Sequence, residues 1–255
     1  MRLVIDVGNT QLFAGLFERD ALLMQFRRTT QAKSSSDEIG LFLKSVLREN
    51  GVTSSEIKTI VIGSVVPNLV HALRAACIKY FTLEPMILQA GIKTGLKIKY
   101  RNPIAVGADR IANAVGATGL FPKQNLIIID FGTATTVCAV SKDKAYLGGW
   151  ILPGLRLSME ALEQNTACLP AVEIKVPTEV VGRSTIDCIQ SGLYFGAVGM
   201  MREAISRLRA DCFQEGAMVI GTGGFSRLFE PEGLFDAFEP ELVLKGLNMI
   251  ADMNA

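Results

Sequence analysis

The chain has a single histidine, His71, and lacks the signatures of several common enzyme classes. One histidine, followed directly by Ala72, leaves no base for a Ser-His-Asp triad and no His-Arg-Asp loop of a protein kinase. No segment reads G-x-x-x-x-G-K-[ST], so the sequence does not encode a P-loop nucleotide site. We interpret His71 as a surface residue on a helix and look for chemistry carried by other residues.

Long apolar runs, charge runs and paired cysteines are also missing. No apolar stretch approaches the ~18 residues of a membrane span, and the chain opens with a strand pattern rather than a signal peptide. The net charge is +1 without a basic run, which gives nucleic-acid binding little support. The five cysteines are odd in number and widely spaced without C-x-x-C, so they argue against a zinc site and predict reduced thiols in a cytosolic protein.

The overall balance of residues is that of a folded chain. Hydrophobic residues make up 49% and charged residues 20% of the 255 positions, which argues against disorder. That length can bury a substantial core as one large domain or two small ones.

Two similar segments each end an apolar strand on an aspartate, which a glycine and hydroxyl residues follow. Leu126 to Thr136 reads LIIIDFGTATT, and Leu3 to Thr10 reads LVIDVGNT. Glycine lets a backbone come close to a ligand, and Thr133 can offer both its N–H and its hydroxyl to a phosphate. Two copies of this pattern predict a duplicated unit with one ligand clamped between the copies.

A second pair of landmarks supports the duplication. Val61 to Ser64, ahead of a helix, mirrors Val219 to Thr222, ahead of another. The segment from Gly221 has Ser226 where a dinucleotide-binding loop needs its third glycine, so we reject that interpretation. Periodicity predicts a mixed α/β fold with six helices: one that follows Ser34–Ser36 and ends at Asn50, and others over Asn68–Phe81, Gly107–Gly119, Leu155–Gln164, Ser184–Arg209 and Leu244–Met253.

Three aspartates lie where phosphoryl transfer could use them. Such a reaction needs a metal site, N–H groups for the phosphates and a base for the acceptor hydroxyl. Asp6 and Asp130 stand at strand ends, where cations can be held, and Asp109 is in a helix's first turn beside Arg110, which could bind an acidic substrate. The alternative is that these aspartates only cap helices and form turns.

The two aspartate turns resemble the phosphate-binding turns of the acetate and sugar kinase/Hsp70/actin superfamily. A narrower resemblance, to the type III pantothenate kinases, extends from Met1 to the Leu242–Asn254 tail. Its motifs are Asn102-Pro103-x-x-Val106-Gly107-Ala108-Asp109-Arg110, Gly148-Gly149-x-Ile151-x-Pro153-Gly154 and Thr222-Gly223-Gly224.

This resemblance implies two duplicated ribonuclease H-like (actin-like ATPase) halves, each a mixed sheet flanked by helices, with the ATP cleft between them. Residues 1–120 would form the half with the first phosphate turn and the acceptor-site aspartate. Residues 121–255 would form the half with the second phosphate turn and a dimerisation helix. The implied activity is phosphorylation of pantothenate by ATP to 4'-phosphopantothenate, the first step of coenzyme A synthesis, in a cytoplasmic homodimer.

The resemblance also implies roles for individual residues. ATP, with Mg²⁺, would bind through its phosphates to Asp6, Val7, Gly8, Asn9, Thr10, Gln11, Leu12, Phe13 and Thr133. Asp109 would be the base that activates the pantothenate hydroxyl, and Asp130 would hold a monovalent cation, K⁺ or NH₄⁺. The pantothenate pocket would be lined by Tyr100, Gly107, Ala108, Asp109, Arg110 and Thr185. Ala105 departs from the polar or acidic residue expected there, and no proposed role depends on it.

Two other functions stay open at this stage. One is a kinase of the same fold that acts on a sugar or another small acid, although Val106-Gly107-Ala108 offers few polar groups for sugar hydroxyls. The other is a non-catalytic regulatory accessory protein or actin-like assembly protein, which would not need an acceptor-side aspartate. Asp109 beside Arg110 favours the pantothenate kinase.

The expected helix Ser184–Arg209 carries Gly192, Gly196 and Gly199 close to one face. Three glycines inside a helix cost about 3 kcal/mol relative to alanine. Close approach of another backbone would explain them. That backbone would belong either to the chain's own sheet or to a second copy at a two-fold interface, where Thr185 would place the substrate pocket nearby.

Overall fold

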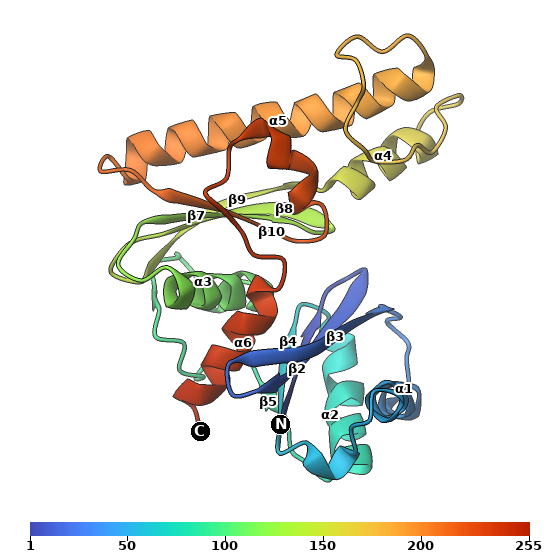
Figure 1. Ribbon diagram of the computed structural model, residues 1–255, viewed down its shortest axis with the longest axis vertical. Helices are drawn as coiled ribbons and strands as arrows, with labels where there is room; N and C mark the ends of the chain where they lie inside the picture. Colours follow the sequence, from blue (N-terminus) through green and yellow to red (C-terminus); the bar gives the residue numbers. More distant parts are fainter. The chain divides into compact units, whose positions relative to one another are not determined.

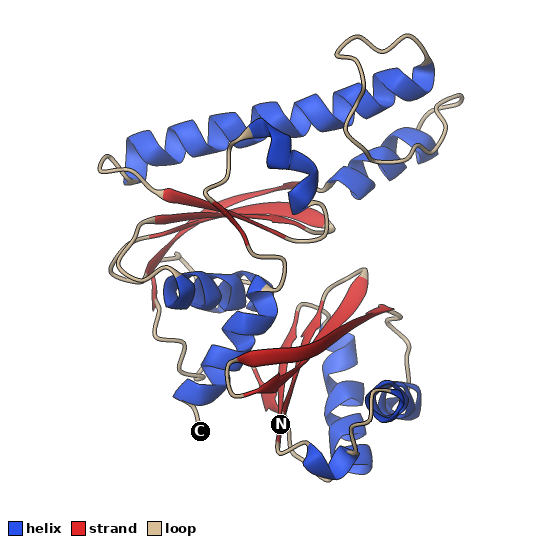
Figure 2. Cartoon of the chain, viewed as in Figure 1, coloured by secondary structure: helices blue, strands red, loops and turns tan.

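The computed structural model describes residues 1–255, and the chain divides into two compact units. Unit 1 comprises Met1–Leu96, Arg101–Gly119 and Leu242–Ala255, and unit 2 comprises Lys97–Tyr100 and Leu120–Glu241. Each unit contains one sheet with helices against it (Figure 2). Both units are discontinuous in sequence, because the last helix belongs to the first unit and residues 97–100 belong to the second.

The sheet of unit 1 has the strand order β3-β2-β1-β4-β5. The hairpin strands β1, β2 and β3 pair antiparallel, whereas β1, β4 and β5 pair parallel. Consequently β1 and β4 end at the same edge of the sheet. The strand bounds are β1 Arg2–Val7, β2 Gln11–Glu18, β3 Ala21–Thr29, β4 Thr59–Ser64 and β5 Met86–Ile87.

Helices α1 (Ser36–Glu49) and α2 (Pro67–Phe81) cover one face of this sheet (Figure 1). Alternate residues of β1, Leu3, Ile5 and Val7, point into the core beneath them, as the period of two of a strand requires. Ser35 and Glu38 form a reciprocal capping box that fixes where α1 begins.

Helix α6 (Leu242–Met253) packs on the opposite face, where two strands offer glycine. A Cβ at Gly63 of β4 would lie 3.1 Å from a methyl of Leu247. Helix α3 (Ala108–Leu120) in turn packs on α6. A Cβ at Gly246 would overlap the carbonyl of Ala112, and one at Gly116 would lie 2.7 Å from the carbonyl oxygen of Leu242. The two helix backbones therefore touch at positions where only glycine fits.

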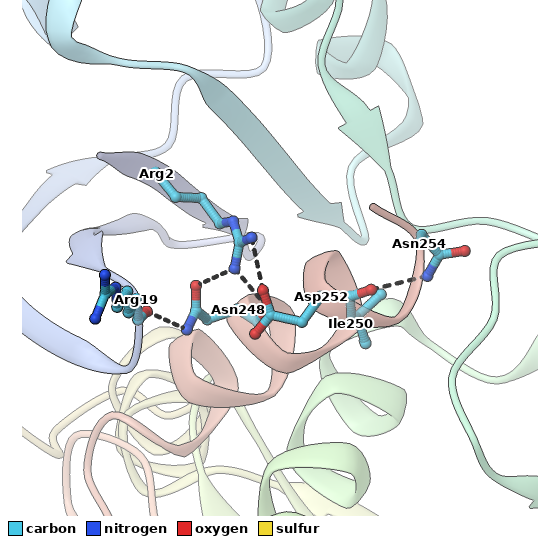
Figure 3. A network of polar contacts seen from close by, with 6 residues as sticks. All are labelled: Arg2, Arg19, Asn248, Ile250, Asp252 and Asn254. Carbon is cyan, nitrogen blue, oxygen red and sulfur yellow. Dashed lines mark hydrogen bonds and ion pairs between the residues drawn. The ribbon is translucent and has the colours of Figure 1, made fainter.

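Polar contacts anchor α6 to the start of β1 (Figure 3). The Arg2 guanidinium donates from Nη1 to Oδ1 of Asn248 at 2.7 Å and from Nη2 to Asp252 at 2.7 Å. The amide of Asn248 donates to the carbonyl of Arg19, in the β2–β3 turn, at 2.9 Å. Because Asn248 is buried while Asp252 is half exposed, the Asn248 contacts carry most of the stabilisation.

The sheet of unit 2 repeats the arrangement of unit 1, with the order β11-β10-β7-β8-β9-β6. The strands β7, β8 and β9 pair antiparallel, and β7, β10 and β11 pair parallel. This duplicated mixed sheet is the one that the sequence predicts. The bounds are β6 Lys97–Ile98, β7 Leu126–Phe131, β8 Ala134–Val140, β9 Ala145–Pro153, β10 Met218–Thr222 and β11 Ala237–Phe238.

Helices α4 (Leu155–Gln164) and α5 (Thr185–Cys212) accompany this sheet, and α5 lies along one of its faces (Figure 1). Its buried side chains, such as Tyr194, Val198 and Met201, join the core that β7 forms with its alternate residues. The glycines of α5 lie on its exposed side, and a Cβ at any of them would meet nothing within 4 Å. The alternative that they pack against the chain's own sheet is therefore wrong.

The other predicted elements agree closely with the structure. All six predicted helices are present, and their ends are within about three residues of the expected ones. The short strand β11 was not predicted, and the segment after β10 contains a 3₁₀ helix, Ser226–Glu232. His71 is an exposed residue of α2, as expected, and all five cysteines are free thiols. None of the helices combines the length and apolar character that crossing a membrane would require.

Candidate active site

The first aspartate turn follows β1 and connects it to β2. The N–H of Gly8 donates to the carbonyl of Gln11 at 3.0 Å, which closes the turn. Within the predicted ATP segment, Val7, Leu12 and Phe13 are buried core residues, whereas the residues from Gly8 to Gln11 are accessible. The accessible part offers backbone N–H groups and the Asn9 and Thr10 side chains, which are suitable donors for an anion.

Asp6 lies at the end of β1 on the face opposite α1 and α2. It is paired in register with Phe13 of β2 and with Gly63 of β4, and the side chain of Asp6 is half-buried. A Cβ at Gly63 would lie 3.7 Å from Oδ1 of Asp6, so Gly63 is in the immediate surroundings of this carboxylate. Asp6, Phe13 and Arg27 of β3 form one row across the sheet, because Phe13 pairs in register with Arg27 on its other side. The Arg27 guanidinium stacks 3.6 Å from the centroid of the Phe13 ring. The row therefore places a cation and a carboxylate on one face of the sheet.

Asp109 occupies the first turn of α3 and is half-buried. Its Oδ1 accepts a hydrogen bond from the N–H of Arg110 at 2.8 Å. A Cβ at Gly107 would lie 2.5 Å from the same oxygen, so Gly107 is required for this position of the carboxylate. Burial raises the pKa of Asp109, and the hydrogen bond from the Arg110 N–H opposes that change. A carboxyl group with a raised pKa is a stronger base than an ordinary aspartate, as general-base catalysis requires.

Unit 1 brings the Asp6 turn and Asp109 to the same edge of its sheet. Val65, just beyond the end of β4, donates its N–H to the carbonyl of Val7 at 3.1 Å. A Cβ at Gly107 would lie 3.5 Å from a methyl of the same Val65. The phosphate turn and the start of α3 are therefore neighbours of one residue, which places a base candidate beside an anion-binding turn.

The second aspartate turn, in unit 2, is enclosed by glycines. Asp130 is paired in register with Thr136 of β8 and Thr222 of β10 and is half-buried. Gly223 has φ +86°, and a Cβ there would overlap Oδ1 of Asp130. The carboxylate thus occupies space that only a glycine at position 223 leaves free.

Thr133 lies at the exposed tip of this turn, next to the start of α4. The N–H of Gly154 donates to the carbonyl of Thr133 at 3.1 Å, and a Cβ at Gly154 would overlap that carbonyl. Glycine at this N-cap position therefore lets the first turn of α4 lie against the second aspartate turn.

Beside α4 lies an apolar groove of about 840 Å³, into which Thr185 faces from the first turn of α5. Its walls come from β9, α4 and α5, and include Pro153, Leu157, Cys188 and Gly192. Tyr100, another residue predicted to line the substrate pocket, lies elsewhere in unit 2. Its ring is 6.4 Å from the ring of Tyr146, centroid to centroid.

The predicted site residues thus form separate groups within the two units. Unit 1 holds the residues from Asp6 to Phe13 and those from Gly107 to Arg110, and unit 2 holds Tyr100, Asp130, Thr133 and Thr185. Arg110 is 5% exposed, so its charge lies inside the protein. No three His, Cys, Asp or Glu side chains gather into a group that could hold a metal alone. Mg²⁺ does not need such a group, since it commonly uses one or two carboxylates with water and phosphate oxygens.

One residue that contributes to the first turn carried no signal in the sequence. Thr30, just after β3, donates its hydroxyl to the carbonyl of Gly8 at 2.7 Å. Its contact depends on the β2–β3 pairing, which brings residue 30 beside residue 8. Sequence spacing alone does not reveal that neighbour.

Solved structures that resemble this chain share its fold at low sequence identity. A Baf family protein from Campylobacter jejuni, described as a transcriptional activator, has a TM-score of 0.64 at 18% identity, over 99% of this chain and 98% of that one. The ethanolamine utilization protein EutJ from Carboxydothermus hydrogenoformans has a TM-score of 0.57 at 12% identity, over 97% and 89%. At these identities the likeness establishes the fold alone.

The amino-acid sequence identifies the family. Residues 2–207 match the family model of type III pantothenate kinase. Proteins named type III pantothenate kinase from Legionella pneumophila (strain Corby) and Elusimicrobium minutum are 56% and 46% identical, each over 100% of this chain and 99% of the relative. The likeness therefore spans both aspartate turns, Asp109 and the last helix, and the chain belongs to the type III pantothenate kinase family.

Proposed function

We propose that the protein transfers the terminal phosphoryl group of ATP to the hydroxyl of pantothenate, giving 4'-phosphopantothenate and ADP in the first step of coenzyme A synthesis. The observation that carries this proposal is Asp109, a half-buried carboxylate with a raised pKa beside the first phosphate turn. Phosphoryl transfer needs chiefly positioning, charge stabilisation and a base, and this edge of the sheet offers all three.

The two aspartate turns would hold the nucleotide. In the Asp6–Phe13 segment, the accessible residues Gly8, Asn9, Thr10 and Gln11 offer the donors that can reach the ATP phosphates. Thr133, exposed at the tip of the second turn, adds an N–H and a hydroxyl. The buried Val7, Leu12 and Phe13 would support the segment from the core.

Two carboxylates could hold cations near those phosphates. Asp6 and Asp130 each end a strand, and Gly223 leaves the space that the Asp130 carboxylate occupies. When bound with ATP, Mg²⁺ neutralises phosphate charge. We assign Asp6 to the Mg²⁺–ATP complex and Asp130 to a monovalent cation, K⁺ or NH₄⁺, among the hydroxyls of its turn.

On the acceptor side, Asp109 would take the proton of the pantothenate hydroxyl as it attacks. Arg110 would bind the pantothenate carboxylate, because a guanidinium inside the protein pairs strongly with such a group. Gly107 and Ala108 would let the substrate approach the backbone at the start of α3. Tyr100 and Thr185, both in unit 2, are the other residues that we assign to pantothenate binding.

The active form would be a homodimer that uses the glycine side of α5. Gly192, Gly196 and Gly199 leave the helix backbone bare, and nothing in the chain covers them. Apolar side chains are also exposed on these helices, including Ile186 and Phe195 of α5 and Leu157 of α4. Exposed apolar surface next to a groove is typical of an interaction site, and a second copy of α5 could approach closely there. Thr185 lines that groove, which would couple substrate binding to dimerisation.

A coupled ADP-release assay tests the proposal, with pantothenate compared against a panel of sugars and small hydroxy acids. We expect ATP-dependent turnover with pantothenate and with none of the other acceptors. Turnover with a sugar instead would identify a different kinase of this fold. Absence of turnover with every acceptor, in protein that binds ATP, would indicate a regulatory protein. We expect the protein to act in the cytoplasm, where ATP and reduced thiols occur together.

A further inference from the structure

Thr30 makes two hydrogen bonds to the first aspartate turn. Its hydroxyl donates to the carbonyl oxygen of Gly8 at 2.7 Å, and its own N–H donates to the carbonyl oxygen of Thr10 at 2.8 Å. Thr30 follows β3, so these bonds attach the turn to the third strand of the sheet. The turn is therefore held from outside as well as by its own bond between Gly8 and Gln11.

The direction of these bonds determines where neighbouring N–H groups point. In a planar trans peptide, the C=O of one residue and the N–H of the next point in opposite directions. Because Thr30 binds the carbonyl of Gly8, the N–H of Asn9 in the same peptide points away from Thr30. The same argument applies to the Thr10 carbonyl and the N–H of Gln11.

The side chain has one role that its backbone cannot perform. The backbone bond from Thr30 to Thr10 continues the pairing of β2 with β3 and would persist with any residue except proline at position 30. The bond to Gly8 comes from the hydroxyl alone. Without it, the Gly8–Asn9 peptide could rotate at little cost, because glycine has access to a wide range of backbone angles.

We propose that Thr30 is a positioning residue for nucleotide binding: its hydroxyl fixes the Gly8–Asn9 peptide so that the Asn9 N–H is directed at an ATP phosphate. The inference rests on the proposed function only in taking this turn as a phosphate-binding turn. A preorganised donor binds more tightly than one that must first be ordered.

The neighbouring Thr29 provides a matched control. It has the same side chain, lies one residue earlier on β3 and is exposed, and it pairs in register with Gln11 rather than bonding to Gly8. Replacing either threonine by valine removes one hydroxyl and keeps the β-branched shape. A general effect of changing this strand end would appear in both variants, whereas the positioning role belongs to Thr30 alone.

The experiment compares Thr30→Val, Thr30→Ser, Thr30→Ala and Thr29→Val in the full-length protein. Binding of ATP and ADP is measured by calorimetry, KM is measured for each substrate, and thermal unfolding checks the fold. Loss of one hydrogen bond should weaken nucleotide binding roughly three- to tenfold in Thr30→Val and Thr30→Ala. The KM for pantothenate should stay unchanged. Thr30→Ser, which keeps the hydroxyl, should bind nucleotide within about twofold of wild type.

The outcomes separate this inference from the proposed function. Wild-type nucleotide affinity in Thr30→Val, equal losses in Thr30→Val and Thr29→Val, or no rescue by Thr30→Ser would overturn the positioning role. If the wild type binds ATP but does not phosphorylate pantothenate, the proposed function fails while the affinity comparison still tests Thr30. If Thr30→Val does not fold, the comparison between Thr30→Ser and Thr30→Ala decides in the same way.

Discussion

Gly223 and Asp130 fit together so closely that a methyl group on the glycine would overlap Oδ1 of the aspartate. The same methyl would lie 2.6 Å from the backbone nitrogen of Phe131, and Gly223 has φ +86°, where side chains are strained. Because two of the nearest atoms belong to the Phe131 backbone, the methyl would fit only if the turn moved. The position of the Asp130 carboxylate therefore depends on a residue 93 positions away in the chain.

Gly223→Ala should displace Asp130 and lower both stability and activity. We expect a loss of about 1–3 kcal/mol in the free energy of unfolding, from backbone strain and overlap. Turnover should fall by roughly 10²-fold, as a displacement of about 1 Å commonly causes. The matched control is Gly224→Ala, since a Cβ at Gly224 meets nothing within 4 Å and its φ is ordinary. Equal effects of the two substitutions on turnover would refute the link between Gly223 and Asp130.

Turnover should depend on K⁺ or NH₄⁺ through Asp130. A monovalent cation beside this carboxylate would offset the crowding of negative charge against the phosphates. The measurement is the rate at saturating ATP in K⁺, NH₄⁺ and Na⁺ buffers of equal ionic strength, for the wild type and for Asp130→Asn. We expect the cation dependence to vanish in the variant. Equal wild-type rates in K⁺ and Na⁺ would contradict this assignment.

The pH dependence should reveal the raised pKa of Asp109. A general base must be ionised, so kcat/KM should fall as the pH drops through a value above the ~3.9 of an ordinary aspartate. As the pH rises through this range, activity should increase, whereas the contribution of Asp109 to stability should decrease. Because burial raises the pKa in the folded protein, ionisation of Asp109 destabilises the fold as the pH rises through that range. Asp109→Asn should therefore unfold at the same or a higher temperature than the wild type at pH 7. A clear decrease at pH 7 would contradict the cause assigned to the pKa.

Gly196→Leu should leave the fold intact and weaken the dimer. The added side chain begins in open space, because a Cβ at Gly196 has no neighbour within 4 Å outside the adjacent backbone of its own helix. At an interface of close helix backbones it would force the two copies apart. The sedimentation coefficient and the turnover of Gly196→Leu should both decrease. The control Ser45→Leu, on the exposed side of α1, should change neither quantity. A dimer unaffected by Gly196→Leu would place the interface elsewhere, and a fully active monomer would separate activity from assembly.

The strand-and-turn pattern was readable in sequence because local rules determine it. Apolar strands that end in Asp-x-Gly recur at Asp6 and Asp130, and the structure confirms two sheets that share an order of five strands, to which unit 2 adds β6. The helix limits were readable for the same reason. Ser35 and Glu38 form a capping box within four residues, and apolar periodicity indicates the length of the helix that follows.

The features that the sequence did not reveal depend on contacts between distant residues. The role of Gly223 beside Asp130 requires β10 to pair with β7, and the bond from Thr30 to Gly8 requires the β2–β3 register. The pairing of α3 with α6 likewise joins Ala112 and Gly246, which are far apart in the chain. The side of α5 on which its glycines lie could not be decided either, because core residues are spread along the same 28-residue helix.

The most direct test of the account is pantothenate-dependent ADP release by the wild type and by Asp109→Asn, with Asp143→Asn, an exposed aspartate of unit 2, as control. We predict that Asp109→Asn folds and binds ATP like the wild type but loses about 10²–10⁴-fold in turnover, which is the usual contribution of a positioned base. Asp143→Asn should retain full activity. A positioned base should account for about 10²-fold or more of the rate. If Asp109→Asn keeps more than about half of the wild-type rate, Asp109 is not the base and the proposed mechanism is contradicted.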